Sequence, residues 1–451
     1  MNSTPEKITQ TDRLISLFEK NKEILNQGSS ALLNQVREVS VNRFAQTGIP
    51  EKKNEDYKYT NMSSAFEKNY TQELVRESGL INLNEVFTNN IPELDAHLVF
   101  LVNGWFYSGN NPSAGLPAGV VLGSLDQIAN ERPDLIANYN ALSGLSTDPF
   151  VALNTAFAKD GFFLFLPKGL VVEKPIQIIN LLSSEDNLMV TQRNLVIAEP
   201  GSCVKLVVCD HTLNSASFLF NSVAEVFVGE DASVDVYTIQ NHHNQSTIVN
   251  SSFYRLESNS SLVTGVVSLH GGLIRNNEKV TFCGDHANAN VNGIAFTDKK
   301  QHVDNFILIE HNSPNCQSNQ IFKGVLDEES TGAFAGRIHV ARDAQQTMAF
   351  QRNNNVLLSD KARMQTKPQL IIDADDVKCS HGATVGQIDE EALFFLRARG
   401  IGEKNARMML MNAFTREVVQ KITIESLRDR LDDLIEKRLS GELSRFYDSK
   451  L

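Results

Sequence analysis

The sequence predicts a mainly β protein, a parallel β-solenoid (β-helix) flanked by helical segments at both ends. Two observations support this class. Short apolar or alternating runs fill the middle of the chain, and turn-forming clusters separate them at a nearly constant interval. Apolar residues recur at helical spacing before and after that region. With 451 residues and 41% hydrophobic content, the chain can bury the cores of two or three such domains.

The first predicted domain, residues 1–96, begins with a helical hairpin. Apolar residues line residues 10–46 at helical spacing, and Gly28 separates two stripes. The stretch TGIPEKKNEDYKYT that follows is rich in charges and turn formers. We therefore expect an exposed connector between the hairpin and the middle of the chain.

Residues 97–376 are predicted to form the β-solenoid core. Turn clusters that begin at Gly201, Asp231, Asn259 and Ala287 are 28 to 30 residues apart. A unit of this length cannot bury its apolar face alone, so neighbouring units are expected to stack. A β-sandwich is the competing architecture, but it predicts no steady period. A solenoid also ends in an open strand edge, which is usually capped or paired with another chain.

The last predicted domain spans residues 377–451 and begins with the segment CSHGATVG. A helix is expected from the N-cap Asp389 to a stop at Gly400, with Glu390 and Glu391 in its first turn. Two further helices follow, because apolar residues recur on one face of each. Those residues are Met411, Phe414, Val418 and Ile422, then Leu427, Leu431, Leu434 and Ile435.

Cys379 and His381 are the first candidate site residues. If residues 377–380 are extended, side chains two positions apart share a face, and both project toward the same neighbour. Thiolate and imidazole are both ligands of iron and zinc. The alternative interpretation is a buried strand end that leads into the helix. The residues alone leave both interpretations open.

Composition excludes several classes of function. The chain has 42 basic and 54 acidic residues, a net charge of -12 and no basic cluster with interleaved aromatics, so nucleic acid is not an expected partner. It has no apolar run of membrane-spanning length and no secretory signal, and we expect a cytoplasmic protein with no membrane partner. The five cysteines form no CxxC pair, so disulfides are not expected.

Other chemistries lack a complete motif. The sequence contains no HExxH, no GxxxxGK[ST] phosphate loop and no GxSxG. Cys283 with His286, or His311 with Cys316, could converge in a folded solenoid. Two alternative functions therefore stay open: a stand-alone β-helix metalloprotein that uses the histidines of the β-domain, and a carbohydrate-active β-helix enzyme.

Several segments resemble the SufB/SufD family of iron-sulfur cluster assembly scaffolds. The most specific is NNNVLLSDKARMQTKPQLIIDADD followed by DDVKCSHGATVGQIDEEALFFLRARGI, in which CSHGATVG has the SufD form. Further similarity lies in CQSNQIFKGVLDEESTGAFAGRIHV, in PKG and EKPI between Pro167 and Ile176, and in GIPEKKNEDYKYTN. The resemblance covers most of the chain. Tyr57 stands where the family commonly has Trp.

The resemblance implies a right-handed parallel β-helix with helical flanks, and it implies partners. Members with the SufD form pair with a SufB-like paralogue through the β-helix, and their C-terminal helices hold a SufC-like ABC-type ATPase. The chain would then be a non-catalytic scaffold subunit, with ATP entering only through SufC. A transient iron-sulfur cluster would form at the SufB/SufD interface. Flavin binding, and a homodimer in the absence of SufB, are left open.

The resemblance also assigns roles to residues. His381 matches the histidine at the SufB/SufD interface, where it would be an iron ligand or a proton-transfer group, with the site's cysteine supplied by SufB. Cys379 would be either a second ligand or a packed strand residue. Docking of the ATPase would involve the helix after Asp389, although the sequence does not decide which of its residues face the core. The residues concerned are Glu391, Phe394, Phe395, Leu396, Arg397 and Arg399.

Overall fold

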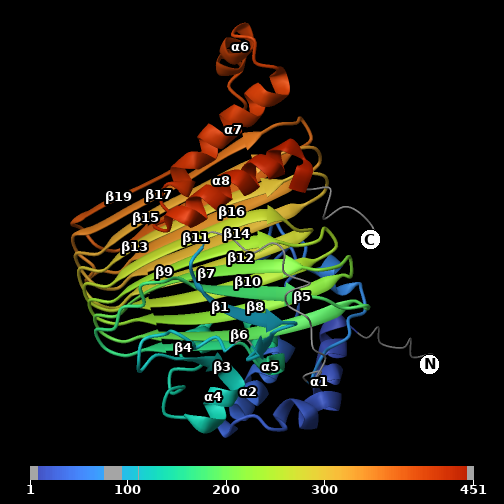
Figure 1. Ribbon diagram of the computed structural model, residues 1–451, viewed down its shortest axis with the longest axis vertical. Coiled ribbons are helices and arrows are strands. Elements are labelled where there is room, and N and C mark those ends of the chain that lie inside the picture. Colours follow the sequence, from blue (N-terminus) through green and yellow to red (C-terminus); the bar gives the residue numbers. More distant parts are fainter. Residues whose placement is uncertain (1–8, 76–93, 110, 444–451) are drawn as a thin grey trace.

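The computed structural model describes residues 9–75, 94–109 and 111–443. Figure 1 shows a long stack of strands with helices beside it and at both ends. From residue 162 onward successive strands alternate between two sheets, so each repeat of about 29 residues gives one strand to each sheet. This confirms the predicted solenoid with helical flanks. Residues 1–8 and 76–93 of the predicted N-terminal domain lie outside the described residues.

The first sheet runs from the C-terminal end of the stack to its N-terminal end. Its neighbouring strands are parallel except for the antiparallel pair β1 and β2. In spatial order it contains β19 (Val377–Gln387), β17 (Thr347–Leu357), β15 (Gln317–Leu326), β13 (Asn288–Thr297), β11 (Ser261–His270), β9 (Ser233–Asn241), β7 (Cys203–Thr212), β5 (Ile176–Leu182), β1 (His97–Val102) and β2 (Trp105–Tyr107).

The second sheet is parallel throughout except for the pair β3 and β4. In this sheet, neighbouring strands from β18 to β4 are every second strand of the sequence, whereas β3 and β4 are consecutive. It contains β18 (Arg363–Ile372), β16 (Thr331–Val340), β14 (His302–His311), β12 (Leu273–Phe282), β10 (Thr247–Leu256), β8 (Phe218–Val228), β6 (Leu188–Ala198), β4 (Phe162–Leu166) and β3 (Val121–Ser124).

The predicted turns have a common local chemistry. Gly201, Asp231 and Asn259 have positive φ angles of 70°, 57° and 59°, as a tight corner between stacked strands requires. The hydroxyls of Ser202 and Ser260 each donate to the carbonyl oxygen three residues earlier, at 2.6 Å. Because the same turn recurs, the strands from β7 to β19 of the first sheet begin 27 to 30 residues apart. The sequence period therefore reflects a repeated turn.

The space between the sheets is apolar at its two sides and polar along the middle. Asn180 donates to Asp210 at 2.7 Å, and Gln240 donates to Asn276 at 2.8 Å. Glu278 accepts from the Thr264 hydroxyl at 3.0 Å and is fully buried, which raises the pKa of its carboxyl group to about 7. Buried polar side chains in a core are stable only when they bond to one another, as these do.

The predicted N-terminal helical hairpin is confirmed. It consists of α1 (Gln10–Asn26) and α2 (Ala31–Thr47), and Gly28 between them has a φ of 76°. With α5 (Pro149–Phe157), the hairpin packs on the outer face of the second sheet, where Met189, Leu219 and Val249 belong to the same apolar cluster. Short helices η1 (Glu55–Tyr57) and η2 (Ser63–Phe66) follow in the connector.

The predicted core, residues 97–376, also contains helices that the sequence pattern did not indicate. These are α4 (Leu125–Glu131), η3 (Ser143–Leu145) and α5, all between β3 and β4. Asp148 caps α5 by accepting from the Phe150 amide at 2.7 Å, and every residue of α5 is buried. A helix that is buried on all sides has no amphipathic period, so its run of apolar residues is easily taken for a strand.

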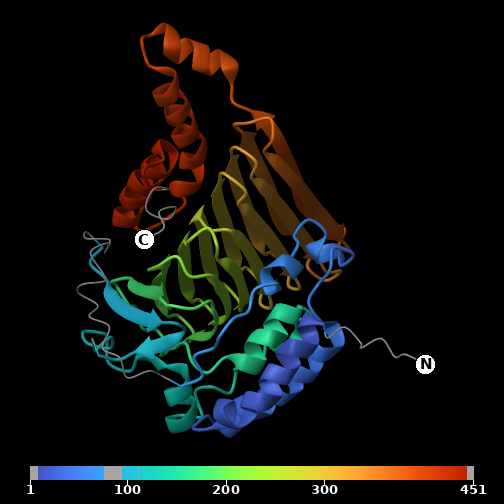
Figure 2. The same ribbon diagram turned by 90° about the vertical axis from the view of Figure 1, so that its right-hand side faces the viewer.

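The C-terminal helices begin later than residue 377. The segment CSHGATVG forms β19, the last strand of the first sheet, and pairs with β17 along its whole length. The helices are α6 (Glu390–Ala398), α7 (Glu403–Val419) and α8 (Glu425–Ser440). The last two cover the outer face of the first sheet, while α6 extends beyond the end of the stack (Figures 1 and 2). No helix among the described residues is long and apolar enough to cross a bilayer.

Candidate functional site

The solenoid ends in two strands that are each paired on one side only. β19 pairs with β17 and β18 pairs with β16, and both stand last in their sheets among the described residues. Ile371, Ile372 and Val385 on these strands are 45%, 39% and 42% exposed. An uncovered strand edge presents unpaired backbone donors and acceptors, and here it also presents apolar side chains. This open end of the solenoid is therefore suited to contact with another chain.

Cys379 and His381 both lie on β19, at the open end. The extended conformation that the sequence predicts is confirmed, and the two side chains fall on the same face of the strand. Cys379 stands beside Ala349 of β17 and packs against the apolar interior, whereas His381 stands beside Gln351 and is exposed. Burial raises the pKa of the Cys379 thiol, so the sulfur stays protonated near neutral pH.

The two residues do not form a complete metal site. Across the part of the chain that the structure describes, no group of three or more His, Cys, Asp or Glu side chains could hold a metal ion. A protein-bound transition metal usually takes about four ligands. A metal centre at His381 would therefore need further ligands from beyond the residues that the structure describes.

Helix α6 begins and ends as the sequence predicts. Asp389 Oδ1 accepts from the backbone amides of Glu391 and Ala392, both at 3.0 Å, and Gly400 has a φ of 86°. Leu393 is the one buried side chain of this helix. The helix is thus well formed although it extends beyond the stack with little covering.

The residues predicted to dock an ATPase fall on different sides of α6. Phe394 and Phe395 are 74% and 55% exposed, and the Arg399 guanidinium lies 4.2 Å from the centre of the Phe395 ring. Arg397 forms an ion pair with Glu403 at 3.3 Å. Leu396 is half-buried and packs against the apolar cluster beneath α7 and α8, while Glu391 is exposed. The outward surface of α6 therefore centres on the two phenylalanines.

Of the other two candidate pairs, His311 and Cys316 are packing residues, whereas Cys283 is half-buried and His286 is exposed, 3.7 Å from Asp285. The His311 ring stacks on Phe282 with centroids 4.3 Å apart, and its Nε2 is 2.9 Å from the Ser318 hydroxyl. Burial lowers the pKa of His311 to about 3. Cys316 is buried and its thiol donates to the Gly284 carbonyl at 3.3 Å. These contacts do not support the stand-alone metalloprotein.

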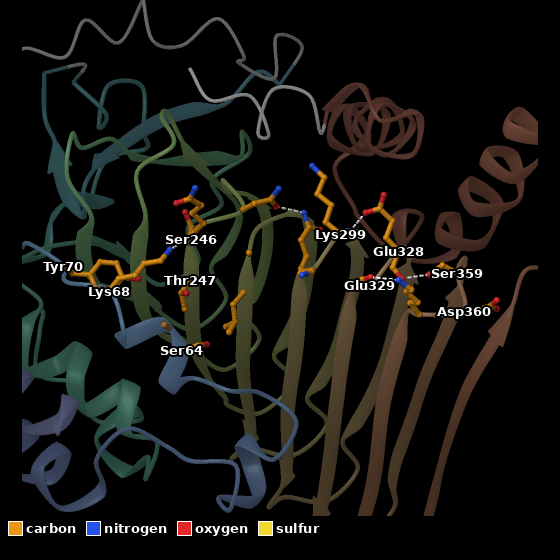
Figure 3. A pocket seen from close by; sticks show the side chains of 18 residues that line it. Ser64, Lys68, Tyr70, Ser246, Thr247, Lys299, Glu328, Glu329, Ser359 and Asp360 are labelled. Atoms are coloured by element: carbon orange, nitrogen blue, oxygen red, sulfur yellow. Dashed lines mark hydrogen bonds and ion pairs between the residues drawn. The ribbon is translucent and has the colours of Figure 1, made fainter. Parts of the chain in front are cut away.

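A groove of about 960 Å³ crosses the turns that lead from the first sheet to the second (Figure 3). Lys361 pairs with Glu329 at 2.6 Å, the Lys299 amide donates to Glu328 at 2.8 Å, and Lys68 donates to the Ser217 hydroxyl at 2.7 Å. Many of its polar groups thus bond to one another. Sequence reasoning missed this groove because its residues come from separate turns and from the N-terminal connector.

Two protein-family models match this chain, and together they span the solenoid. The model for the SufBD core domain of the SUF system for FeS cluster assembly matches residues 180–414. The model for the SufBD protein N-terminal region matches residues 8–178. The chain belongs to the SufBD family.

Relatives from bacteria and a plant align with most of this chain. An iron-sulfur cluster assembly SufBD family protein of Synechocystis is 27% identical over 95% of this chain and 96% of its own. The iron-sulfur cluster assembly protein SufD of Escherichia coli is 26% identical over 88% of this chain and 91% of its own. The chloroplastic protein ABCI7 of Arabidopsis thaliana is 30% identical over 89% and 85%. The chain is thus a SufD-like member of the family.

The connector in the SufBD N-terminal region fastens the helices to the solenoid. Tyr57, where the resemblance implies Trp in other members, donates from its hydroxyl to Asp148 at 2.6 Å. The Arg275 guanidinium lies 4.5 Å from the centre of the Tyr57 ring and pairs with Asp304, which also accepts from Thr60. The phenol thus supplies a hydrogen bond and a stacking surface, which an indole can also supply.

Proposed function

We propose that this chain is the SufD-like subunit of an iron-sulfur cluster assembly scaffold. It pairs with a SufB-like paralogue through the open end of the solenoid, and it holds a SufC-like ABC-type ATPase on α6. The observation that carries the proposal is the coincidence of His381 with that open end. The residue that matches the family's interface histidine lies on the last strand of a sheet with no covering neighbour among the described residues.

Pairing at the open end is supported by the chemistry of the two edge strands. β18 and β19 contain 10 and 11 residues, and along each the outward backbone groups lack a strand partner among the described residues. A second solenoid with a similar end can supply that partner and cover Ile371, Ile372 and Val385 at the same time. A second copy of this chain has the same chemistry, so a homodimer can form when the paralogue is absent.

Docking of the ATPase is supported by the two exposed phenylalanines. Fully covering both rings removes roughly 200–300 Å² of apolar surface from water, which corresponds to about 5 kcal/mol before the costs of association. Glu391, Arg397 and Arg399 surround them with charge, as a polar rim surrounds an interface core. Because the sequence has no phosphate loop, ATP hydrolysis belongs to the partner and the chain itself is non-catalytic.

At the shared interface, His381 acts on the nascent cluster, which is a product that leaves the scaffold. Its exposed imidazole can bind an iron ion through one ring nitrogen or carry a proton to or from the site. The Cys379 thiol is half-buried and its pKa is raised, so it is less suited to either role, and the thiolate ligands come from the paralogue. We place this work in the cytoplasm.

Native mass spectrometry of the tagged chain, purified anaerobically from its own host, tests the proposal. The expected particle contains this chain, one paralogous solenoid chain and two copies of an ATPase. Iron and sulfide should be present in the assembled particle, and the chain alone should hold little metal. A chain that is recovered alone with stoichiometric metal contradicts the proposal and restores the stand-alone metalloprotein.

A further inference from the structure

We infer that Gln351 is a positioning residue for His381: its side-chain oxygen accepts a hydrogen bond from the imidazole and so fixes the tautomer of the ring. The inference rests on the proposed function, in which His381 acts on iron at the open end. It concerns a residue on the neighbouring strand that no sequence motif singles out.

Three polar side chains are in register at the open end of the first sheet. Gln320 on β15 stands beside Gln351 on β17, which in turn stands beside His381 on β19. Neighbouring strands of a sheet lie about 4.8 Å apart, and residues in register present their side chains on the same face. Gln320 and Gln351 are each 1% exposed, whereas His381 is exposed. The three side chains therefore form a column that leads from the interior to the surface.

The hydrogen bond between Gln351 and Gln320 fixes the orientation of the Gln351 carboxamide. Gln351 donates from Nε2 to Oε1 of Gln320, toward the interior. In a planar carboxamide the oxygen points away from the nitrogen, so Gln351 Oε1 points toward β19. Among the described residues this buried oxygen has no hydrogen-bond partner. A buried acceptor without a donor costs about 1–3 kcal/mol, and the next side chain in the column, His381, has a donor to offer.

The facing sheet leaves space for this arrangement. Gly336 on β16 lies opposite Gln351, and a Cβ atom at Gly336 would be 1.9 Å from Gln351 Nε2. Any larger residue would therefore displace the carboxamide from its present position. Glycine at this point of the sheet permits the close approach that keeps Gln351 Oε1 directed at β19.

A neutral imidazole that donates from one ring nitrogen to a fixed acceptor keeps its other nitrogen unprotonated. That second nitrogen is the one that can bind iron, and the acceptor also sets the orientation of the ring. Gln351 is neutral, so it orients the imidazole without adding charge to the site. The Gln351 oxygen has no partner among the described residues, and a partner chain that covers β19 and excludes water favours its hydrogen bond to His381.

The first test measures the imidazole tautomer of His381 by ¹⁵N NMR on the full chain, with the signals assigned through His381→Asn. The wild-type chain should show one tautomer. Gln351→Leu, which removes the acceptor, should show a mixture, as should Gly336→Ala, whose Cβ displaces the carboxamide. Gln351→Glu keeps an acceptor at the same place, with Gln320 rotating its amide to donate, and should restore one tautomer when the spectra are recorded at a pH at which the imidazole is neutral.

Gln240→Leu is the matched control, because it removes another fully buried amide from the interior, far from the open end. The His381 signals should be unchanged in this variant. A folded Gln351→Leu chain with the His381 signals of the wild type would overturn the inference. So would a wild-type chain in which the two tautomers are already mixed.

A second test measures the affinity of the assembled complex for Fe²⁺. Loss of a residue that orients a metal-binding histidine typically weakens metal binding about 10- to 100-fold, so Gln351→Leu should lose that much and Gln351→Glu should regain most of it. The NMR result is independent of cluster assembly. If Gln351 controls the tautomer but His381→Ala assembles clusters normally, the proposed function fails and the positioning contact stands.

Discussion

Cys379 packs against the interior of the solenoid, whereas His381, two residues further along the same face of β19, is exposed at its open end. One strand thus presents two side chains of types that can bind metals in different environments. The sulfur is protonated and half-covered, and the imidazole can reach a neighbouring chain. The exposed imidazole is suited to contact with another chain, whereas the thiol is suited to packing. The CSHG motif alone does not distinguish these two roles.

Substitution of His381 by Ala should lower the yield of assembled clusters by about tenfold or more, because a ligand or proton carrier is lost. The complex should still assemble, since the side chain is exposed. Cys379→Ala is the comparison, and its yield should stay within about twofold of the wild type. Iron and sulfide content of the purified complex gives both values. Equal losses in the two variants would make Cys379 a ligand as well.

Phe394→Asp should release the ATPase, because a charge replaces the most exposed ring of α6. The loss of affinity should be about 30-fold or more, as for the central residue of an interface. The free energy of unfolding should change by less than about 0.5 kcal/mol, since the position is exposed. Leu145→Asp, at a 79% exposed apolar residue far from α6, is the control and should leave ATPase binding unchanged. Binding is measured by co-purification and titration calorimetry.

Glu278→Gln should remove part of the pH dependence of stability. Burial raises the pKa of Glu278 from 4.5 in the unfolded chain to about 7, so its stabilising contribution is full below pH 4.5 and lost as pH rises through 7. The free energy of unfolding of the wild type should fall by about 2–3 kcal/mol more than that of the variant between pH 5 and 8. Urea unfolding at both pH values measures this. Parallel pH curves for the two proteins would show that Glu278 is not the group responsible.

Glu225→Ala should destabilise the fold by about 3–5 kcal/mol, because it removes the ion-pair partner of the buried Arg193 guanidinium. Glu225 lies 2.9 Å from Arg193 and accepts from the backbone amides of Asn140, Leu142 and Ser143. Glu329→Ala breaks the exposed pair with Lys361 and should cost under about 1 kcal/mol. Denaturant unfolding of the two variants gives the comparison. Similar losses would mean that burial does not distinguish these pairs.

The features that could be predicted from the sequence are those that depend on residues close together in the chain. The turns at Gly201, Asp231 and Asn259 recur because stacked strands need the same corner each time, so the solenoid was readable from their spacing. The cap Asp389 and the hairpin around Gly28 were also local features. They were visible because a single residue type satisfies a single backbone requirement.

Features that depend on register or on packing were not predicted. α5 has no polar face, and its sequence did not distinguish it from a buried strand. The end of the solenoid was placed before β19, because the pairing of that strand with β17 is a contact between residues 30 apart. The same holds for the column of Gln320, Gln351 and His381. Its members are separated by one full repeat, and no local motif connects them.

The stacked turns also have a thermodynamic consequence for the open end. In a solenoid each coil is stabilised by its two neighbours, so a terminal coil opens at a lower free energy than one in the middle. The coil formed by β18 and β19 has one neighbour among the described strands. A partner that covers it supplies the second neighbour. Binding of the partner therefore raises the free energy of opening of this coil, and any change that makes the coil open more easily weakens the binding.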